Sequence, residues 1–68
     1  MKTAKKMFKK LGLSYSKDGY QIHYYNYNDD RYIWFYLDTE TIEITFDIDI
    51  KHLQAVNQQV KELGWDEQ

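Results

Sequence analysis

The sequence contains no cysteine, which excludes a disulfide framework and a thiolate metal site. It also lacks proline and low-complexity tracts, so no stretch is typical of a linker between domains. Its glycines are isolated at Gly12, Gly19 and Gly64, a spacing that excludes a glycine-rich phosphate loop. From 68 residues we expect a single small domain, residues 1–68, with one core.

Long hydrophobic runs are absent as well. No apolar stretch approaches the roughly 20 residues of a membrane span, and the lysine-rich start lacks the apolar segment of a signal peptide. The absence of cysteine also fits a reducing compartment. We therefore expect a cytoplasmic protein without a membrane partner.

Acidic residues are missing from the first 17 positions, which hold six lysines. The rest of the chain holds three basic residues and all eleven acidic ones, a net charge of −8 within an overall net charge of −2. Most nucleic-acid-binding domains are basic. The composition therefore predicts a basic first element on an acidic body, and it argues mildly against nucleic acid as the partner.

The basic element is predicted to be a helix over residues 3–11. Apolar side chains recur there at the spacing of one helical face, at Ala4, Met7, Phe8 and Leu11. At about 100° per residue, the other face carries a candidate basic patch: Lys5, Lys6, Lys9 and Lys10. This patch could contact phosphates, or it could be the solvated side of an amphipathic helix. Gly12 is typical of a left-handed cap in which Leu13 folds back onto Phe8.

Three segments with period-two alternation follow the helix. They predict strands over residues 20–27, 32–37 and 42–48. Paired as two hairpins, the strands give one mainly aliphatic face, and the first two strands place aromatic rings on the opposite face. Residues 13–16 also alternate, which leaves open a short fourth strand at the edge of the sheet.

The predicted pairing of these strands depends on their turns. Two-residue turns at Asp29–Asp30 and Thr39–Glu40 put aliphatic side chains together on one face in both hairpins. The resulting partners include Tyr25 with Trp34 and Phe35 with Ile44. Neither turn carries the favoured Asn-Gly or Asp-Gly pair, so either loop could be one or two residues longer.

A second helix is predicted to begin after Asp49, a residue suited to an N-cap, and to end at Leu63 and Gly64. Its apolar stripe is predicted to consist of Leu53, Val56, Val60 and Leu63. Trp65 follows the glycine and is placed to pack on Val60. Residues 66–68 are predicted to form a loose C-terminal tail.

Together these elements predict an α+β fold in two layers, in the order α-β-β-β-α. An antiparallel three-stranded meander would carry both helices on its aliphatic face, because each layer must bury its apolar side. Phe35 and Ile44 are expected in the core between the sheet and the helices. The aromatic face is then either bare or covered by something else.

This aromatic face is the strongest candidate site in the sequence. Six ring side chains would lie on it: His23, Tyr25, Tyr27, Tyr32, Trp34 and Tyr36. Such rings could form an interface, since tyrosine and tryptophan dominate interface hot spots, or they could only stabilise a small sheet by cross-strand pairing. They could also stack bases, but acidic residues predicted on the same side would repel phosphates: Glu43, Asp47 and Asp49.

Catalytic constellations are not recognisable. The two histidines, His23 and His52, fall on different elements, so a histidine metal site is not expected. Ser14 and Ser16 have no neighbouring base to activate them, and the acidic turns lack the spacing of a calcium loop. We therefore expect no enzymatic activity, no metal or other cofactor, and no small-molecule ligand.

The two ends of the chain resemble small proteins encoded by phages, prophages and mobile elements of Gram-positive bacteria. The resemblance is carried by Ala4 to Gly12, by Leu53 to Asn57 and by Val60 to Trp65. It covers about a third of the chain closely, and the middle only through its tyrosine-rich strands. It implies an accessory protein made inside an infected or lysogenic cell, and it carries no catalytic residues over to this chain.

The sequence thus favours a non-enzymatic protein-interaction module that binds a protein partner, or a second copy of itself, through the aromatic face. One alternative is a nucleic-acid-binding protein that uses the lysines of the first helix and the rings. Another is an acidic mimic of nucleic acid that inhibits a host enzyme, because the body of the chain is strongly acidic.

Overall fold

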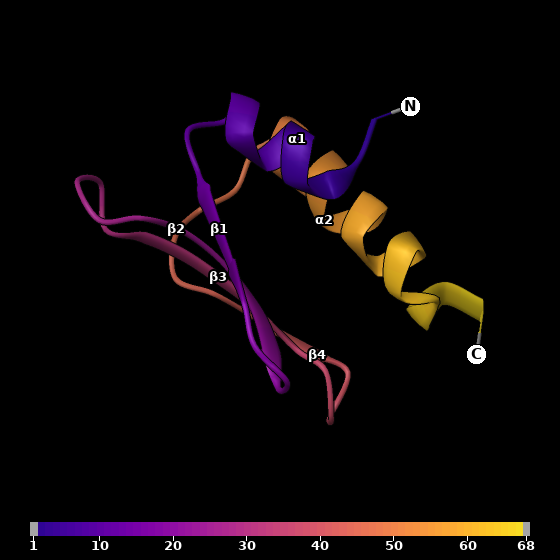
Figure 1. The fold of residues 1–68 in the computed structure, drawn as a ribbon. Helices are drawn as coiled ribbons and strands as arrows, with labels where there is room; N and C mark the ends of the chain where they lie inside the picture. Colours follow the sequence, from indigo (N-terminus) through magenta and orange to yellow (C-terminus); the bar gives the residue numbers. More distant parts are fainter. Residues whose placement is uncertain (1, 68) are drawn as a thin grey trace.

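The computed structural model describes residues 2–67, which form two layers. The elements in chain order are α1 (Ala4–Lys10), β1 (Ser14–Lys17), β2 (Gln21–Asn26), β3 (Arg31–Tyr36), β4 (Thr41–Ile44), α2 (Ile50–Leu63) and the 3₁₀ helix η1 (Trp65–Glu67). The strands form an antiparallel meander in the order β1-β2-β3-β4, and both long helices lie on one side of it (Figure 1). The predicted α+β fold is confirmed, and β1 supplies the fourth strand that the sequence left open.

The end of α1 has the predicted cap. Gly12 adopts a left-handed conformation with φ of 87°, and its N–H donates to the Lys9 carbonyl at 3.0 Å. The Leu13 N–H donates back to the Phe8 carbonyl at 3.0 Å, which completes a Schellman motif. Leu13 thereby enters the core beneath the helix, and the chain turns directly into β1.

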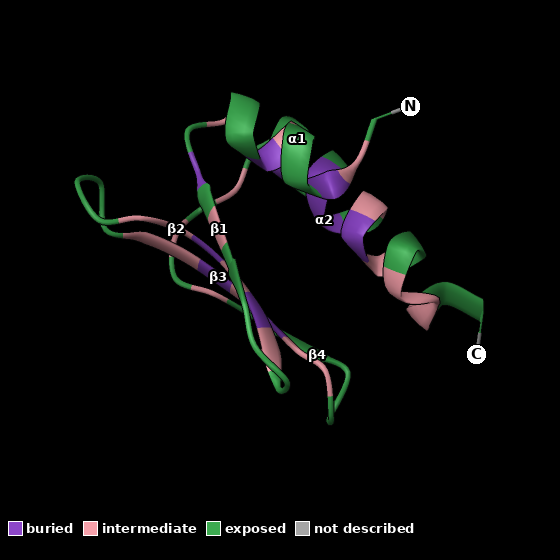
Figure 2. Cartoon of the chain, viewed as in Figure 1, coloured by how far each residue is buried: buried purple, intermediate pink, exposed green. Residues whose placement is uncertain are grey.

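Side chains from both layers form one core. Its buried members are Ala4, Phe8, Leu13, Ile22, Tyr24, Ile33, Phe35, Ala55 and Val56, and Figure 2 shows them where the helices face the sheet. Phe35 is fully buried, as predicted. Ile44 is only half-buried, because β4 is an edge strand that the helices cover incompletely.

The predicted strand registers are wrong by two residues in both hairpins. Trp34 pairs with His23, not with Tyr25, and Phe35 pairs with Ile42, not with Ile44. Each turn contains four residues, 27–30 and 37–40, instead of two. Left-handed residues close both turns, Asp30 at φ 51° and Glu40 at φ 55°. Because side chains alternate with a period of two, a shift of two residues changes the partners but leaves every side chain on its predicted face.

The last strand is also shorter than the predicted range of 42–48. The Thr45 hydroxyl oxygen accepts the Tyr32 N–H at 3.1 Å, a donor that a continuing ladder would pair with a main-chain carbonyl. The Thr45 N–H still donates to the Tyr32 carbonyl at 3.1 Å, but the Thr45 side chain replaces the return bond of this pair, and β4 ends at Ile44.

Helix α2 has the predicted ends but a rotated apolar face. Asp49 caps its start by accepting the His52 N–H at 2.9 Å, and Gly64 ends it at φ 75°. The buried positions are His52, Ala55, Val56 and Gln59, whereas Leu53 is 42% exposed. The predicted stripe is therefore wrong at Leu53, because two polar side chains occupy the buried side: Gln59, which accepts from Tyr24 in the core, and His52, which contacts Asp49 and Arg31.

Residues after α2 continue as a short helix. Trp65 packs against the core, with its ring centroid 6.2 Å from that of Phe35. Asp66 and Glu67 belong to η1, while Gln68, the last residue of the predicted loose tail, lies outside the described residues. No helix between residues 2 and 67 has the length and apolar character needed to cross a membrane.

The aromatic face of the sheet as the candidate functional site

The candidate site is the outer side of the sheet, opposite the two helices (Figure 1). Alternation along β2 and β3 directs five rings to this side, and the turn between the strands adds Tyr27. The six predicted residues, here called the aromatic face, are His23, Tyr25, Tyr27, Tyr32, Trp34 and Tyr36. All are half-buried except Tyr27, which is exposed.

Five of the six rings form a continuous stack across the two central strands. His23 and Trp34 are register partners whose rings are nearly parallel, at 8°, with centroids 4.7 Å apart. Tyr32 continues the stack on Trp34 at 5.7 Å and 17°. Tyr25 lies 5.0 Å from His23 and 4.7 Å from Tyr27. These separations are typical of attractive aromatic pairs, so the stack stabilises the β2–β3 hairpin whatever else it does.

Tyr36 lies beside the stack and has a different partner. Its hydroxyl donates to Glu43 Oε1 on β4 at 2.7 Å, and this hydrogen bond raises the pKa of Tyr36 above its ordinary value. Glu43 is also the register partner of Trp34. Among the outward positions of the four described strands, Glu43 carries the one charge. The face is therefore aromatic with a weakly acidic edge.

His23 is an uncharged member of the stack at neutral pH. Its neighbours desolvate the imidazole, and burial lowers the pKa of His23 below 6.5. Its Nε2 atom is buried and has no hydrogen-bond partner among residues 2–67. The ring thus contributes mainly its flat surface, as tyrosine and tryptophan do next to it.

Of the acidic residues expected on this side, Asp49 lies in the helix layer and Asp47 is not part of a strand. The strand prediction was too long, so Asp47 and Asp49 follow the end of β4. The Asp49 carboxylate caps α2 in the helix layer, where hydrogen bonds from His52 lower the pKa of Asp49. The aromatic face therefore lacks the predicted Asp49 carboxylate, whereas Asp30, which was not predicted there, interacts with Tyr32.

The candidate basic patch is divided between two sides of α1. The Lys5 ammonium lies 4.5 Å from the centre of the Tyr15 ring, over the inner side of β1. Lys6 and Lys10 border the space between α1 and α2. All four lysines belong to the helix layer, on the opposite side of the sheet from the aromatic face (Figure 1). One nucleic-acid strand therefore cannot contact both predicted features without passing round an edge of the sheet.

Sequence reasoning missed a polar cluster centred on Arg31. This guanidinium forms an ion pair with Asp29 at 3.3 Å and donates to the Leu11 carbonyl at 3.3 Å. Its Nη1 lies 3.4 Å from His52 Nε2, and His52 Nδ1 lies 2.7 Å from the Asp49 carboxylate. The cluster joins the ends of α1, β3 and α2, so we infer that its role is to hold these elements together. The three-residue spacing of Asp49 and His52 was its one signal in the sequence.

Within residues 2–67, no group of three or more histidine and carboxylate side chains is placed to hold a metal ion. The two histidines are on opposite sides of the sheet. His23 lies on the outer side, and His52 lies on the buried side of α2. The arrangement around the aromatic face offers flat apolar surface, tyrosine hydroxyls, and the carboxylates of Glu43 beside Tyr36 and of Asp30 beside Tyr32. These groups suit binding more than bond-making chemistry.

No protein-family model, curated protein or solved structure matches this chain. The resemblance to phage and mobile-element proteins therefore stays a prediction.

Proposed function

We propose that this protein is a non-enzymatic interaction module that binds a protein partner through the aromatic face. The observation that carries the proposal is the stack of five rings on a side of the sheet over which residues 2–67 place no second layer. Exposed aromatic surface of this extent is uncommon on monomers and typical of interaction sites. The predicted origin in a phage or mobile element would make the partner a host or phage protein.

A second copy of the chain is the partner to test first. Two such sheets could pack face to face about 10 Å apart, with their helices outside, around a two-fold axis. His23 and Trp34 occupy the two central strands and would lie near the middle of such an interface. Tyr36 and Glu43 already satisfy each other's hydrogen bond, so they could form a polar rim.

Nucleic-acid binding is less well supported by this geometry. The rings and the lysines lie on opposite sides of the sheet, and the charged groups next to the rings are the carboxylates of Glu43 and Asp30. Phosphates bound beside the stack would meet these negative charges without a neighbouring lysine on the same side.

Sedimentation velocity over a wide range of protein concentrations tests the proposal. Trp34→Ala should weaken self-association by about thirtyfold or more, equivalent to about 2 kcal/mol, and Tyr36→Ala should weaken it less. Tyr20→Ala is the matched control, because Tyr20 is 75% exposed and lies outside the stack. A wild-type protein that stays monomeric at the highest concentration would exclude the homodimer. Immobilised wild type and Trp34→Ala can also be compared for the host proteins that they retain. Equal retention would show that the aromatic face is not the interface.

A further inference from the structure

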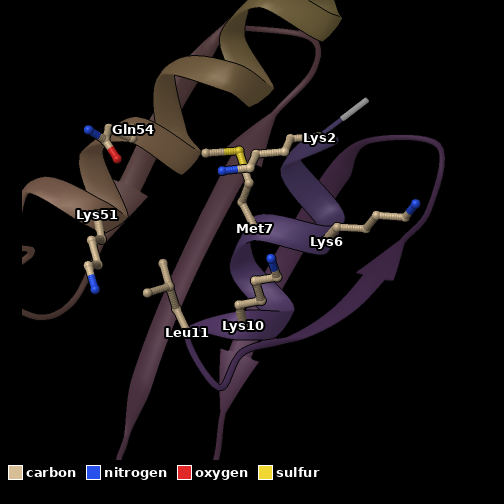
Figure 3. A pocket seen from close by; sticks show the side chains of 7 residues that line it. All are labelled: Lys2, Lys6, Met7, Lys10, Leu11, Lys51 and Gln54. Atoms are coloured by element: carbon tan, nitrogen blue, oxygen red, sulfur yellow. The ribbon is translucent and has the colours of Figure 1, made fainter.

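The helix layer contains a second surface feature, a groove between α1 and α2 with a volume of about 570 Å³. Seven residues line it, and they define the lysine groove: Lys2, Lys6, Met7, Lys10, Leu11, Lys51 and Gln54. Figure 3 shows Lys51 and Gln54 on α2, facing Lys2, Met7 and Leu11 across the gap. Lys10 points into the same space, while the ammonium of Lys6 extends outward along α1.

The lining is strongly basic and has no internal counter-charge. Four of the seven lining residues are lysines and none is acidic. The two ion pairs given for residues 2–67, Arg31 with Asp29 and His52 with Asp49, involve none of these lysines. The ammonium groups therefore raise the local positive potential on a molecule whose overall net charge is −2.

Between the lysines lies an apolar floor. Met7 and Leu11 are half-buried and pack against the core, so the parts of them that line the groove are fixed in place. A ligand that fits the groove thus carries negative charges flanking at least one apolar group.

We propose that the lysine groove binds an acidic segment of a partner protein, in which carboxylates pair with the lysines and an apolar side chain rests on Met7 and Leu11. This inference is independent of the proposed function, because the groove and the aromatic face lie on opposite sides of the sheet. Charge complementarity indicates the chemistry of the ligand, because a groove lined by four lysines and no acidic residue attracts carboxylates.

A protein segment fits the groove better than a nucleic acid does. The lining has no aromatic ring on which a base could stack, and no arginine that could grip a phosphate in two places. Residues 18–68 carry a net charge of −8, which would repel a long polyanion wherever it extended beyond the groove. A short acidic segment confined to the groove avoids that repulsion.

Fluorescence anisotropy with three labelled probes tests this proposal. The probes are a short peptide of glutamate, leucine and glycine, an oligoglutamate without leucine, and an oligothymidylate of the same net charge. Each is titrated with the full chain at low salt and again at about 0.15 M, where the Debye length is about 8 Å. We expect the leucine-containing peptide to bind most tightly and to lose affinity as salt rises.

Charge-matched variants locate the binding. Lys10→Gln combined with Lys51→Gln removes one lysine from each wall of the groove, and this should weaken peptide binding by about tenfold or more. Lys9→Gln combined with Lys61→Gln removes the same charge from the same two helices outside the lining, and should weaken it by less than about threefold. Trp34→Ala should leave peptide affinity unchanged, because Trp34 belongs to the aromatic face. Peptide binding therefore tests the lysine groove separately from the proposed role of the aromatic face.

Several outcomes would overturn the proposal. Equal losses in the two double variants would mean diffuse attraction without a site. Tighter binding of the oligothymidylate would assign the groove to nucleic acid, and equal binding of oligoglutamate would remove the role of Met7 and Leu11. No measurable peptide binding at low salt would reject the site altogether.

Discussion

At the scale of single residues, the neighbours His23 and Tyr24 show how alternation along one strand separates two roles. Tyr24 points into the core and is 1% exposed, and its hydroxyl donates to Gln59 Oε1 at 2.6 Å. This burial raises the pKa of Tyr24 well above its ordinary value. His23 points outward into the ring stack, where its Nε2 finds no partner among the described residues. The same strand therefore buries one satisfied polar group and one unsatisfied polar group on opposite faces.

Tyr24→Phe should lower the free energy of unfolding by about 1–3 kcal/mol. The variant leaves the Gln59 carbonyl oxygen buried without its donor, and an unsatisfied buried acceptor costs about that much. Urea denaturation of the two proteins measures the loss. Adding Gln59→Leu to Tyr24→Phe should recover part of it, since both polar partners are then gone. A double variant less stable than the single one would show that the hydrogen bond is not the cause.

His23 should make stability depend on pH below neutrality. Burial lowers its pKa in the folded state below 6.5, so the unfolded chain binds the proton more readily. Stability is then fully present above pH 6.5 and falls as pH decreases toward the folded-state pKa. Urea denaturation between about pH 7.5 and pH 5.5 measures this slope, and His23→Phe should reduce it while keeping a ring in the stack. The same slope in both proteins would assign the proton uptake to another group.

At the scale of elements, caps and turns decide what the short segments can do. Helix α1 has only seven residues, a length that is not stable alone in water. It is held by the Thr3 side chain at its start and by the Schellman motif at its end. Its packing on the core therefore depends on Gly12, the residue that allows the chain to reverse into β1.

Gly12→Ala should destabilise the protein by about 1–2 kcal/mol. The residue has φ of 87°, which costs a residue with a side chain about that much, and a new Cβ would lie 3.2 Å from Arg31 Nη2. Gly64→Ala separates the two effects, because it has φ of 75° but no described atom within 4 Å of the new Cβ. Gly19→Ala should change stability by less than about 0.5 kcal/mol, since it has neither feature. Thermal unfolding of all three variants provides the comparison, and equal losses at Gly12 and Gly19 would contradict it.

At the scale of the whole molecule, one small core is shared by both layers. Phe35 is its centre: it is fully buried on β3, 6.4 Å from the Phe8 ring of α1 and 6.2 Å from Trp65 after α2. A core in a chain of this size rarely supplies more than about 3–5 kcal/mol. The free energy lost with a single central ring is therefore comparable to the free energy of unfolding of the whole protein.

Phe35→Ala should cost about 3–5 kcal/mol and leave the chain largely unfolded at room temperature, because the cavity opens between both layers. Trp34→Ala is the matched variant one residue away on the outer face, where lost cross-strand contacts should cost only about 1 kcal/mol. Circular dichroism during thermal unfolding measures both. A cooperatively folded Phe35→Ala variant with an unchanged melting temperature would contradict the assignment of the two faces.

Local patterns in the sequence predicted the element types, the caps and the two faces of the sheet. The helix ends at Gly12 and Gly64, and the outward direction of Trp34, follow from short-range geometry. Five of the six rings of the candidate site follow from the same alternation, since side chains alternate along a strand whatever its register, while Tyr27 lies in the turn after β2. The lysines of α1 were likewise predicted to share a helix opposite its apolar stripe.

Only the tertiary structure decided which residues meet across elements. Four-residue turns made His23, not Tyr25, the partner of Trp34, and the side chain of Thr45 ended β4 early. Buried partners rotated α2 away from Leu53, and its position beside α1 brought Lys51 to the groove that Lys10 borders. Periodicity assigns a residue to a face of its own element. It carries no information on how two elements are rotated and shifted against each other, which depends on side-chain packing and hydrogen bonds between distant residues.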